Sequence, residues 1–439
     1  MKNYLITPAI YLLFILETLA LSACMGQAGI YGAPILFFGS SLALAGLAIR
    51  QGSRATAAPS PPDTHNASPD QARDWTSLLF AAIAFTALVA YARTTFYHVP
   101  LDPGISDVFP QVLTAARAWL RGEYAYQIVQ LPTYTMNNTY LPMQWLPFCA
   151  TEYLGKDPRW IPVAAWSVAF LMLIYQLRLP FLQHRATPLH RLLLGLGLCL
   201  PAWAAYSFIR YNMLDYGLTL ELLPAAYYVG LCVGLLSGSA WAMGLALGAC
   251  LLSQFSILFF LPFVAYYIAT AHSRQKMYRA FGIAATFVLL VFVLPFMTQD
   301  PQLPAKIVGN YDGGALSEWR GQAWQAPGTE PHQLSRGLGM AIFFKKAFEP
   351  DLVAGIRWLK RTEIALCLSM TLLAWLLYRR YGTTPRRRQW LLLGGLKLYF
   401  VFFYHFVLIP YPYLFLMPMT TSAIIVPQAA KELSEPTPP

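Results

Sequence analysis

Long apolar blocks, separated by short polar links, recur along most of this 439-residue chain. A helix of about 20 apolar residues is long enough to cross the ~30 Å hydrocarbon layer of a bilayer. Backbone N–H and C=O groups find no water inside lipid, so such blocks must be helices. The sequence therefore predicts an all-α polytopic membrane protein with about 12 transmembrane helices. We expect the spans over residues 4–22, 30–49, 76–93, 160–178, 189–208, 213–235, 240–253, 256–271, 280–297, 362–378, 389–408 and 412–427.

Charged residues make up only 12% of the chain, whereas apolar residues make up 57%. A soluble domain carries roughly 25% charged residues, because its surface needs polar cover. The deficit argues against a soluble enzyme and predicts the lipid bilayer as a partner. The net charge of +11 comes largely from Lys and Arg in the links between apolar blocks, which is the pattern of positive-inside retention. We therefore expect no nucleic-acid partner.

A Pro-, Ser- and Ala-rich linker at residues 50–75 divides the chain and is predicted to be disordered and cytoplasmic. Before it, residues 1–49 are predicted to form a two-helix membrane hairpin that begins with an uncleaved anchor. After it, residues 76–430 are predicted to form the main transmembrane domain, and residues 431–439 a disordered tail. The six cysteines lie in apolar stretches without paired spacing, so they predict neither a disulfide nor a zinc site.

The orientation follows from the basic links. Arg and Lys gather in the links after the spans that end at about 178, 271 and 378, and these links share the cytoplasmic side only if residues 140–154 do not cross. That segment is short and holds two prolines, so we expect an interfacial or re-entrant helix. The polar stretches 94–159 and 298–361 then face outward. The chain is predicted to be multi-pass in the plasma (inner) membrane, with its active site on the extracytoplasmic face.

An amphipathic helix is predicted from Val108 to Leu120, because apolar residues recur there at helical spacing. Asp107 stands immediately before this helix. Asp is a preferred helix cap, which gives the residue a structural interpretation. A carboxylate on the face that carries both long loops also has a catalytic interpretation. The spacing leaves both open, whereas Asp102 reads as a turn residue and Glu123 as a solvated one.

Several segments of the chain follow one another in the same order as the motifs of a known family. The run SDVFPQVLTAARAWLRGEYAY places an acidic residue before an aromatic-rich helix that ends in Gly-x-x-x-Tyr, here Gly122 and Tyr126. The next segment of the pattern is YLPMQWLPFCATEYL. It is followed by a small-residue helix and a polar break, SGSAWAMGLALGACLLSQFS, and by FFYHFVLIPYPY at a late span. Together, over roughly residues 76–427, they resemble the polyprenyl-phosphate-mannose-dependent mannosyltransferases of glycosyltransferase family 87. Relatives often carry a lysine at the polar break, where this chain has Ser253-Gln254.

The resemblance implies the GT-C architecture. It implies a glycosyltransferase that moves a hexose, with mannose expected, from a polyprenyl-phosphate donor to an extracytoplasmic lipid or glycan acceptor with inversion. This chemistry needs a carboxylate base and cations for the departing phosphate. We expect Asp107 as the base. The candidates for donor-phosphate binding are Arg159, Arg210 and Lys345, and those for acceptor or sugar binding are His405, Tyr126, Tyr140 and Trp319. No cofactor and no metal ligands are predicted, and metal dependence is left open.

Structural interpretations stand beside several of these assignments. Arg at a helix end is commonly an interfacial anchor, a buried His is commonly a packing residue, and Trp commonly anchors a loop at the membrane surface. Asp312, beside two glycines, is interpreted as a turn residue. Two rival functions also remain: a transporter or flippase of lipid-linked glycans, and a polysaccharide polymerase or ligase. A transporter predicts ionisable residues near the middle of the membrane.

Overall fold

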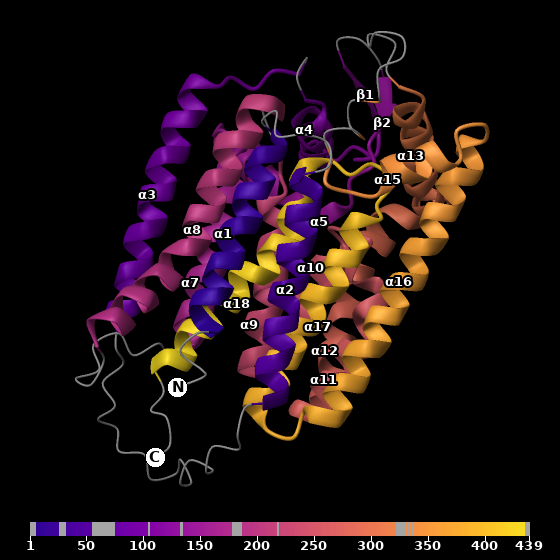
Figure 1. The fold of residues 1–439 in the computed structure, drawn as a ribbon. Coiled ribbons are helices and arrows are strands. Elements are labelled where there is room, and N and C mark those ends of the chain that lie inside the picture. Colours follow the sequence, from indigo (N-terminus) through magenta and orange to yellow (C-terminus); the bar gives the residue numbers. More distant parts are fainter. Residues whose placement is uncertain are drawn as a thin grey trace.

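The computed structural model describes residues 6–25, 32–54, 75–103, 106–131, 135–177, 187–216, 219–321, 331, 334 and 337–434, which form a bundle of helices (Figure 1). Its long helices are α1 (Ile6–Met25), α2 (Gly32–Arg54), α3 (Thr76–His98), α7 (Trp160–Leu177), α8 (Pro188–Tyr216), α9 (Leu222–Ser237), α10 (Ala240–Leu251), α11 (Leu261–Ala271), α12 (Arg274–Val288), α16 (Leu352–Tyr381), α17 (Pro385–His405) and α18 (Leu416–Ser434). Helical turns extend some of them: η4 (Phe255–Phe260) precedes α11, η5 (Leu289–Met297) follows α12, and η6 (Pro412–Phe415) precedes α18.

Seven helical segments of the described chain are long and apolar enough to cross a membrane. They are α2, α3, α7, α8, α12 with η5, α16, and η6 with α18; the shorter apolar helices are α1, α9, α10, and η4 with α11. The prediction of an all-α membrane protein is therefore confirmed. Each predicted apolar block overlaps a helix of the bundle. The number of spans and the GT-C architecture remain predictions.

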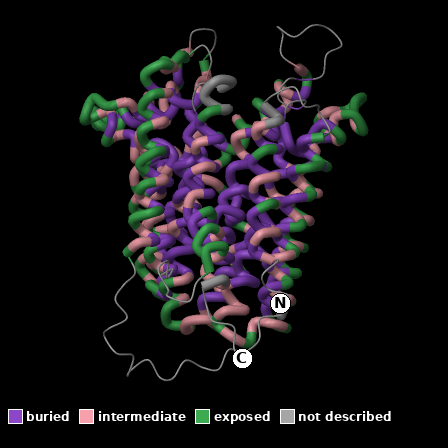
Figure 2. The backbone as a smooth tube through the Cα atoms, turned by 60° about the vertical axis from the view of Figure 1, so that its left-hand side comes forward, coloured by how far each residue is buried: buried purple, intermediate pink, exposed green. Residues whose placement is uncertain are grey.

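The outside of the bundle is apolar. Figure 2 shows buried residues along its middle and exposed ones around its edge. Large apolar side chains are among the exposed ones, including Leu79 and Ile83 on α3, Leu290 on η5 and Leu372 on α16. In water such a surface would drive aggregation, whereas in a bilayer it contacts lipid chains at no cost.

Both long polar stretches lie at one end of the bundle, and both termini lie at the other (Figure 1). The first stretch holds α4 (Val108–Leu120), the hairpin of β1 (Ile128–Gln130) and β2 (Thr135–Asn137), and three short helices, α5 (Pro142–Trp145), η3 (Leu146–Phe148) and α6 (Cys149–Leu154). Helix α4 has the predicted bounds. Each of these short helices ends where the next begins, at Leu146 and at Cys149. None of the three therefore has the length of a membrane span.

The second stretch holds α13 (Leu303–Arg320) and α15 (Ala341–Ala347). Helix α13 corrects the prediction of a turn at Asp312. The helix continues through Gly313 and Gly314, whose positions leave open space around them, and Asp312 forms an ion pair with Lys360 of α16. The paired glycines suggested a break, but the flanking apolar residues Ile307 and Ala315 are buried, and this packing outweighs the low helix propensity of glycine.

The N-terminal helices pack into the bundle. Helix α2 runs along α17, while α1 contacts α2 and α18. Inside this contact the ammonium of Lys397 (α17) lies 2.7 Å from the carboxylate of Glu17 (α1), and both side chains have no exposed surface. Ser41 of α2 donates a 2.5 Å hydrogen bond to Glu17 and accepts one of 3.1 Å from Lys397. A neutralised polar cluster thus joins the hairpin to a late helix.

Glycines bring α10 and α12 into close contact. A Cβ atom at Gly244 would stand 2.6 Å from Cβ of Ile283, and one at Gly248 would stand 2.7 Å from the ring of Phe287. The two glycines are four residues apart and so share one helix face. Small residues at this spacing let membrane helices approach closely, so the predicted small-residue helix has a packing role.

Candidate functional site

Asp107 stands at the head of α4, on the end of the bundle that carries both long polar stretches (Figure 1). Its side chain makes no capping hydrogen bond to the helix. The hydroxyl of Ser106 instead accepts a hydrogen bond of 3.3 Å from the N–H of Val108. The backbone is already helical at Asp107, whose carbonyl accepts from the N–H of Gln111 at 3.1 Å. The capping interpretation is therefore wrong for this carboxylate.

Segments that are distant in sequence meet around Tyr413 of η6. Its hydroxyl lies within electrostatic range of Tyr411, Tyr140, Glu221 and Asp107, in decreasing order of effect. Asp107 precedes α4, Tyr140 precedes α5 and Glu221 precedes α9. Tyr413 lies within η6. Tyr413 also stacks on Tyr411, with ring centroids 5.0 Å apart. The arrangement gathers two carboxylates and several phenols at one end of the bundle.

Glu221 belongs to a buried chain of hydrogen bonds. Its carboxylate accepts a 2.8 Å hydrogen bond from the amide of Gln254, whose own carbonyl oxygen accepts one of 2.6 Å from the Tyr404 hydroxyl. Glu221 lies between α8 and α9, outside both apolar helices, and is almost wholly buried. Burial raises its pKa to about 7, although the hydrogen bond from Gln254 limits the rise. Near neutral pH this group can therefore exchange a proton.

The polar break between α10 and η4 lies where the sequence predicts it, at Ser253 and Gln254. It is tied to the first outer stretch, because the N–H of Met143 in α5 donates to the carbonyl of Leu252 at 2.9 Å. The hydroxyl of Tyr227 in α9 then donates to the carbonyl of Met143 at 2.9 Å. The break thus connects α5, α9 and α10, and the amide of Gln254 occupies the position where a lysine is expected from the resemblance.

Arg159 is occupied by contacts within the fold. Only 3% of its surface is exposed, and its guanidinium forms an ion pair of 2.5 Å with Asp157. It also donates hydrogen bonds to the carbonyls of Phe96 and Val99, at 2.9 and 2.5 Å. These carbonyls end α3, so Arg159 closes the C-terminus of that helix as a cation should. This geometry favours the anchoring interpretation over donor-phosphate binding.

The other two proposed phosphate ligands lie apart in the chain. Arg210 is exposed in the last turns of α8. Lys345 is largely buried in α15, with its ammonium 3.9 Å from the carboxylate of Glu349 one turn later. A pair at that distance is weak. Both assignments stay predictions.

His405 is fully buried at the end of α17. Its Nδ1 lies 2.6 Å from the carbonyl of Val401, and its ring packs edge-on against Phe38 and Phe415, with centroids 4.7 and 5.1 Å away. Phe38 belongs to the N-terminal hairpin. These surroundings favour the packing interpretation of His405 over acceptor binding. The ring has no exposed surface that an acceptor could contact.

The aromatic candidates fall into different environments. Tyr126 lies in an aromatic cluster whose other rings include Tyr124, Trp145 and Phe296, with centroids 5.2 to 6.4 Å from its own. Tyr140 is half-buried beside α5, where its N–H donates to the side chain of Asn138 at 3.0 Å. Tyr140 and Asp107 both lie within electrostatic range of Tyr413, whereas Tyr126 belongs to the cluster beyond the C-terminal end of α4.

Trp319 requires a correction. Its ring has no exposed surface, and its indole N–H donates a 2.8 Å hydrogen bond to the carbonyl of Leu408. It packs in a small apolar cluster with Ala315, Leu359 and Ile409. A buried ring cannot stack on a sugar, so Trp319 anchors α13 to the end of α17 instead.

Two features of this end of the molecule were not assigned from the sequence. They are Tyr404 and Glu221, which received no role in the sequence analysis. The available signal was a lone carboxylate at the edge of an apolar block, together with a polar break inside another block. An ionisable residue in such a position needs a polar partner. Here Gln254, at the polar break, donates a hydrogen bond to the carboxylate of Glu221.

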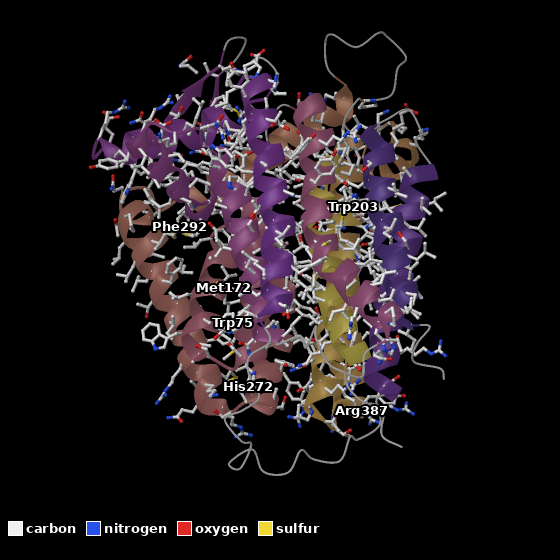
Figure 3. The ribbon with its side chains drawn as sticks, turned by 90° about the vertical axis from the view of Figure 1, so that its left-hand side faces the viewer. Trp75, Met172, Trp203, His272, Phe292 and Arg387 are labelled. Carbon is white, nitrogen blue, oxygen red and sulfur yellow. The ribbon has the colours of Figure 1, made fainter. Side chains whose placement is uncertain are left out.

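The two ends of the bundle differ in charge. The outer end carries carboxylates throughout its two polar stretches, among them Asp102, Glu152, Asp300 and Glu349. The opposite end carries the basic links, and Figure 3 shows His272 and Arg387 there, with Phe292 toward the outer end. Among the residues that the structure describes, no group of three or more His, Cys, Asp or Glu side chains is arranged to hold a metal ion.

Comparison of the chain with protein-family models, with curated proteins and with solved structures finds no match. The resemblance to the mannosyltransferases of family 87 therefore rests on the sequence motifs alone.

Proposed function

We propose that the chain is a membrane glycosyltransferase that moves a hexose, with mannose the first candidate, from a polyprenyl-phosphate donor to an extracytoplasmic acceptor. The supporting observation is the carboxylate of Asp107, which makes no capping bond to α4 and lies within electrostatic range of the Tyr413 hydroxyl. It lies at the end of an apolar bundle, where a water-soluble acceptor group and a lipid-bound donor can meet. The resemblance supplies the donor class.

The chemistry assigns a defined step to each group. The carboxylate of Asp107 takes the proton of the acceptor hydroxyl while the hydroxyl oxygen attacks the anomeric carbon. The bond between that carbon and the phosphate oxygen breaks, and the phosphate leaves with the electron pair. Attack from the side opposite the phosphate inverts the anomeric carbon. Glu221, whose pKa of about 7 lets it carry a proton, is the nearby carboxyl able to relay the proton away.

The departing phosphate needs cations. Arg210, exposed in the last turns of α8, and Lys345, in α15, remain the candidates. Arg159 is left out of the proposal, because Asp157 and two helix-end carbonyls already occupy its donors.

A transporter or flippase of lipid-linked glycans is the alternative, and the buried pair of Glu17 and Lys397 favours it, because ionisable residues inside a membrane commonly mark transport paths. The pair is closed, however, with the Lys397 ammonium also donating to the carbonyl of Pro418 at 2.8 Å. Flipping of a fluorescent lipid-linked glycan across proteoliposomes that contain the purified protein would favour this alternative.

The test of the enzyme is turnover by the purified protein with a panel of radiolabelled polyprenyl-phosphate sugars. Asp107→Asn should lower release of the label by about two to four powers of ten, the usual contribution of a general base. The matched control is Asp102→Asn, which removes an exposed carboxylate from the same stretch and should leave turnover unchanged. Wild-type turnover by purified Asp107→Asn would overturn the assignment of the base, and a wild-type protein that uses no donor of the panel would overturn the donor class.

A further inference from the structure

A groove of about 210 Å³ opens on the outer end of the bundle, between the C-terminal end of α4 and the end of η5. Its lining consists of Trp119, Gly122, Glu123, Tyr124, Phe296 and Gln299. Gly122 has a φ of 73°, which turns the chain sharply away from α4, and a Cβ there would meet no atom within 4 Å. The turn thus leaves open space on this side of the groove.

Aromatic rings form the apolar wall of the groove. Trp119 contacts Phe296 with ring centroids 5.4 Å apart, and Tyr124 contacts the same phenylalanine at 6.3 Å. Behind them, Trp145 packs against Trp119 at 6.2 Å and holds its indole in place. Trp119 nevertheless keeps 40% of its surface exposed. A fixed, exposed indole face is suited to stacking against a flat apolar surface.

Polar groups form the rest of the lining. Glu123 accepts two hydrogen bonds of 2.9 Å from Arg121, which hold its pKa below the usual value and fix an ionised acceptor at the rim. Gln299 donates from its amide nitrogen to the carbonyl of Pro295 at 2.8 Å, which orients the side chain. The hydroxyl of Tyr124 is buried and has no hydrogen-bond partner among the described residues. With no accessible surface, this hydroxyl lies behind the wall of the groove, so the polar contacts open to a ligand are those of Glu123 and Gln299.

We propose that this groove binds a sugar ring of the acceptor, and hence that the acceptor is an oligosaccharide. Sugar rings combine apolar C–H faces, which stack on an indole, with hydroxyl groups that bond to carboxylates, amides and phenols. An isoprenoid chain would have no bond to offer Glu123 or Gln299, so the mixed lining favours a glycan over a lipid tail.

The position of the groove sets the length of the acceptor, and this step rests on the proposed function. Asp107 and Trp119 lie at opposite ends of α4, and a helix rises 1.5 Å per residue, so about 20 Å separates them. A single hexose cannot cover that distance. An acceptor that reaches both positions must extend over several sugar units along α4, with its reacting hydroxyl at Asp107.

The experiment measures binding of α-linked mannotetraose and of mannose to the purified full-length protein by calorimetry, with no donor present. Trp119→Ala should weaken tetraose binding about tenfold, the effect of losing one aromatic contact with its buried area. Trp119→Phe keeps an aromatic face and should stay within about threefold of wild type. The control is Tyr153→Ala, which removes an aromatic ring with 83% of its surface exposed on the same end and should bind as wild type.

Equal tetraose affinity for wild type and Trp119→Ala, or no tetraose binding to the wild type, would overturn the inference. So would displacement of bound tetraose by sugar-free polyprenyl phosphate, because the groove would then belong to the lipid. The result is separable from the proposed function: Asp107→Asn should bind tetraose normally while transfer is lost, and binding in a protein without transferase activity would leave the groove as a glycan site of another function.

Discussion

Glu221 is a carboxylic acid held almost without access to water, at the meeting point of three helices. Its hydrogen bond with Gln254 and the further bond from Tyr404 join residues that are 33 and 150 positions apart. Such a chain fixes the orientation of each side chain, since an unpaired polar group there would cost about 1–3 kcal/mol. The carboxyl group is consequently a structural link between α9, η4 and α17.

We expect the stability of the protein to fall as pH rises through 7, because Glu221 has a folded-state pKa of about 7 against 4.5 in an unfolded chain. The folded state binds the proton more tightly, so the contribution is complete below pH 4.5 and is lost as pH rises past the folded-state pKa. The effect is on the order of 3 kcal/mol. Thermal unfolding in detergent between pH 5 and 8 measures it, with Glu221→Gln expected to flatten the profile relative to wild type. Identical profiles for both proteins would contradict the prediction.

Lys397 and Glu17 should behave as one unit. Lys397→Met leaves the Glu17 carboxylate buried with Ser41 as its remaining partner, so we expect a loss of about 3–5 kcal/mol in the free energy of unfolding. Replacing both residues, as Glu17→Leu with Lys397→Met, removes the charges together and should restore most of that loss. Thermal unfolding of the single and double variants separates the two cases. A double variant as unstable as the sum of the singles would show that the pair is not coupled.

The sequence indicated part of the site and could not indicate the rest. Asp107 was found because it stands beside a helix whose apolar periodicity can be recognised from adjacent residues alone. Val108 follows it directly, and Gln111 lies one turn later. The contact of Glu221 with Gln254, in contrast, depends on how α9 packs against α10, which no local pattern encodes. Trp319 failed for the same reason: an aromatic residue in a polar stretch resembles an exposed one until the surrounding helices are placed.

Helices were predicted well wherever the apolar block was long. The element that failed is α13, because its glycines suggested a turn, whereas Leu303 and Ile307 pack into the main core and Trp319 packs into a second apolar cluster. Boundaries also moved: α9 begins at Leu222, so Glu221 lies outside a helix that was expected to include it. Local propensity therefore determined the long elements, and tertiary packing determined their ends.

At the level of elements, the contact of α10 with α12 should be sensitive to any side chain at Gly244. Gly244→Val would bring a Cβ within 2.7 Å of the carbonyl oxygen of Ala280, so the helices must separate. We expect a loss of about 1–3 kcal/mol, the usual cost of overpacking, measured by thermal unfolding in detergent. The control is Gly282→Val on α12, where a Cβ would meet open space. Equal losses in both variants would mean that helix propensity, and not the contact, sets the cost.

At the scale of the whole molecule, the charge asymmetry and the exposed apolar belt belong together. The exposed apolar side chains around the bundle require a lipid environment. A bundle in a bilayer has one end facing the cytoplasm, and the distribution of Lys and Arg determines which end it is. The end with both termini carries Arg274, Lys276, Arg386 and Arg387 in the first turns of α12 and α17, whereas basic residues at the other end are accompanied by carboxylates, such as Arg117 by Glu152 at 2.6 Å. The positive-inside rule then predicts that the end with the termini faces the cytoplasm.

Cysteine labelling tests this orientation. In a background whose six cysteines are replaced by alanine, Lys156→Cys and Lys346→Cys put a thiol in each long polar stretch, and Thr383→Cys puts one in a basic link; all three positions are exposed. A membrane-impermeant maleimide added to intact cells should label the first two and reach the third only after the membrane is opened. Labelling of Lys156→Cys and Lys346→Cys from opposite sides would contradict the fold, because both stretches lie at one end of the bundle (Figure 1). Labelling of Thr383→Cys alone would reverse the orientation and place Asp107 in the cytoplasm, where the proposed extracytoplasmic acceptor could not reach it.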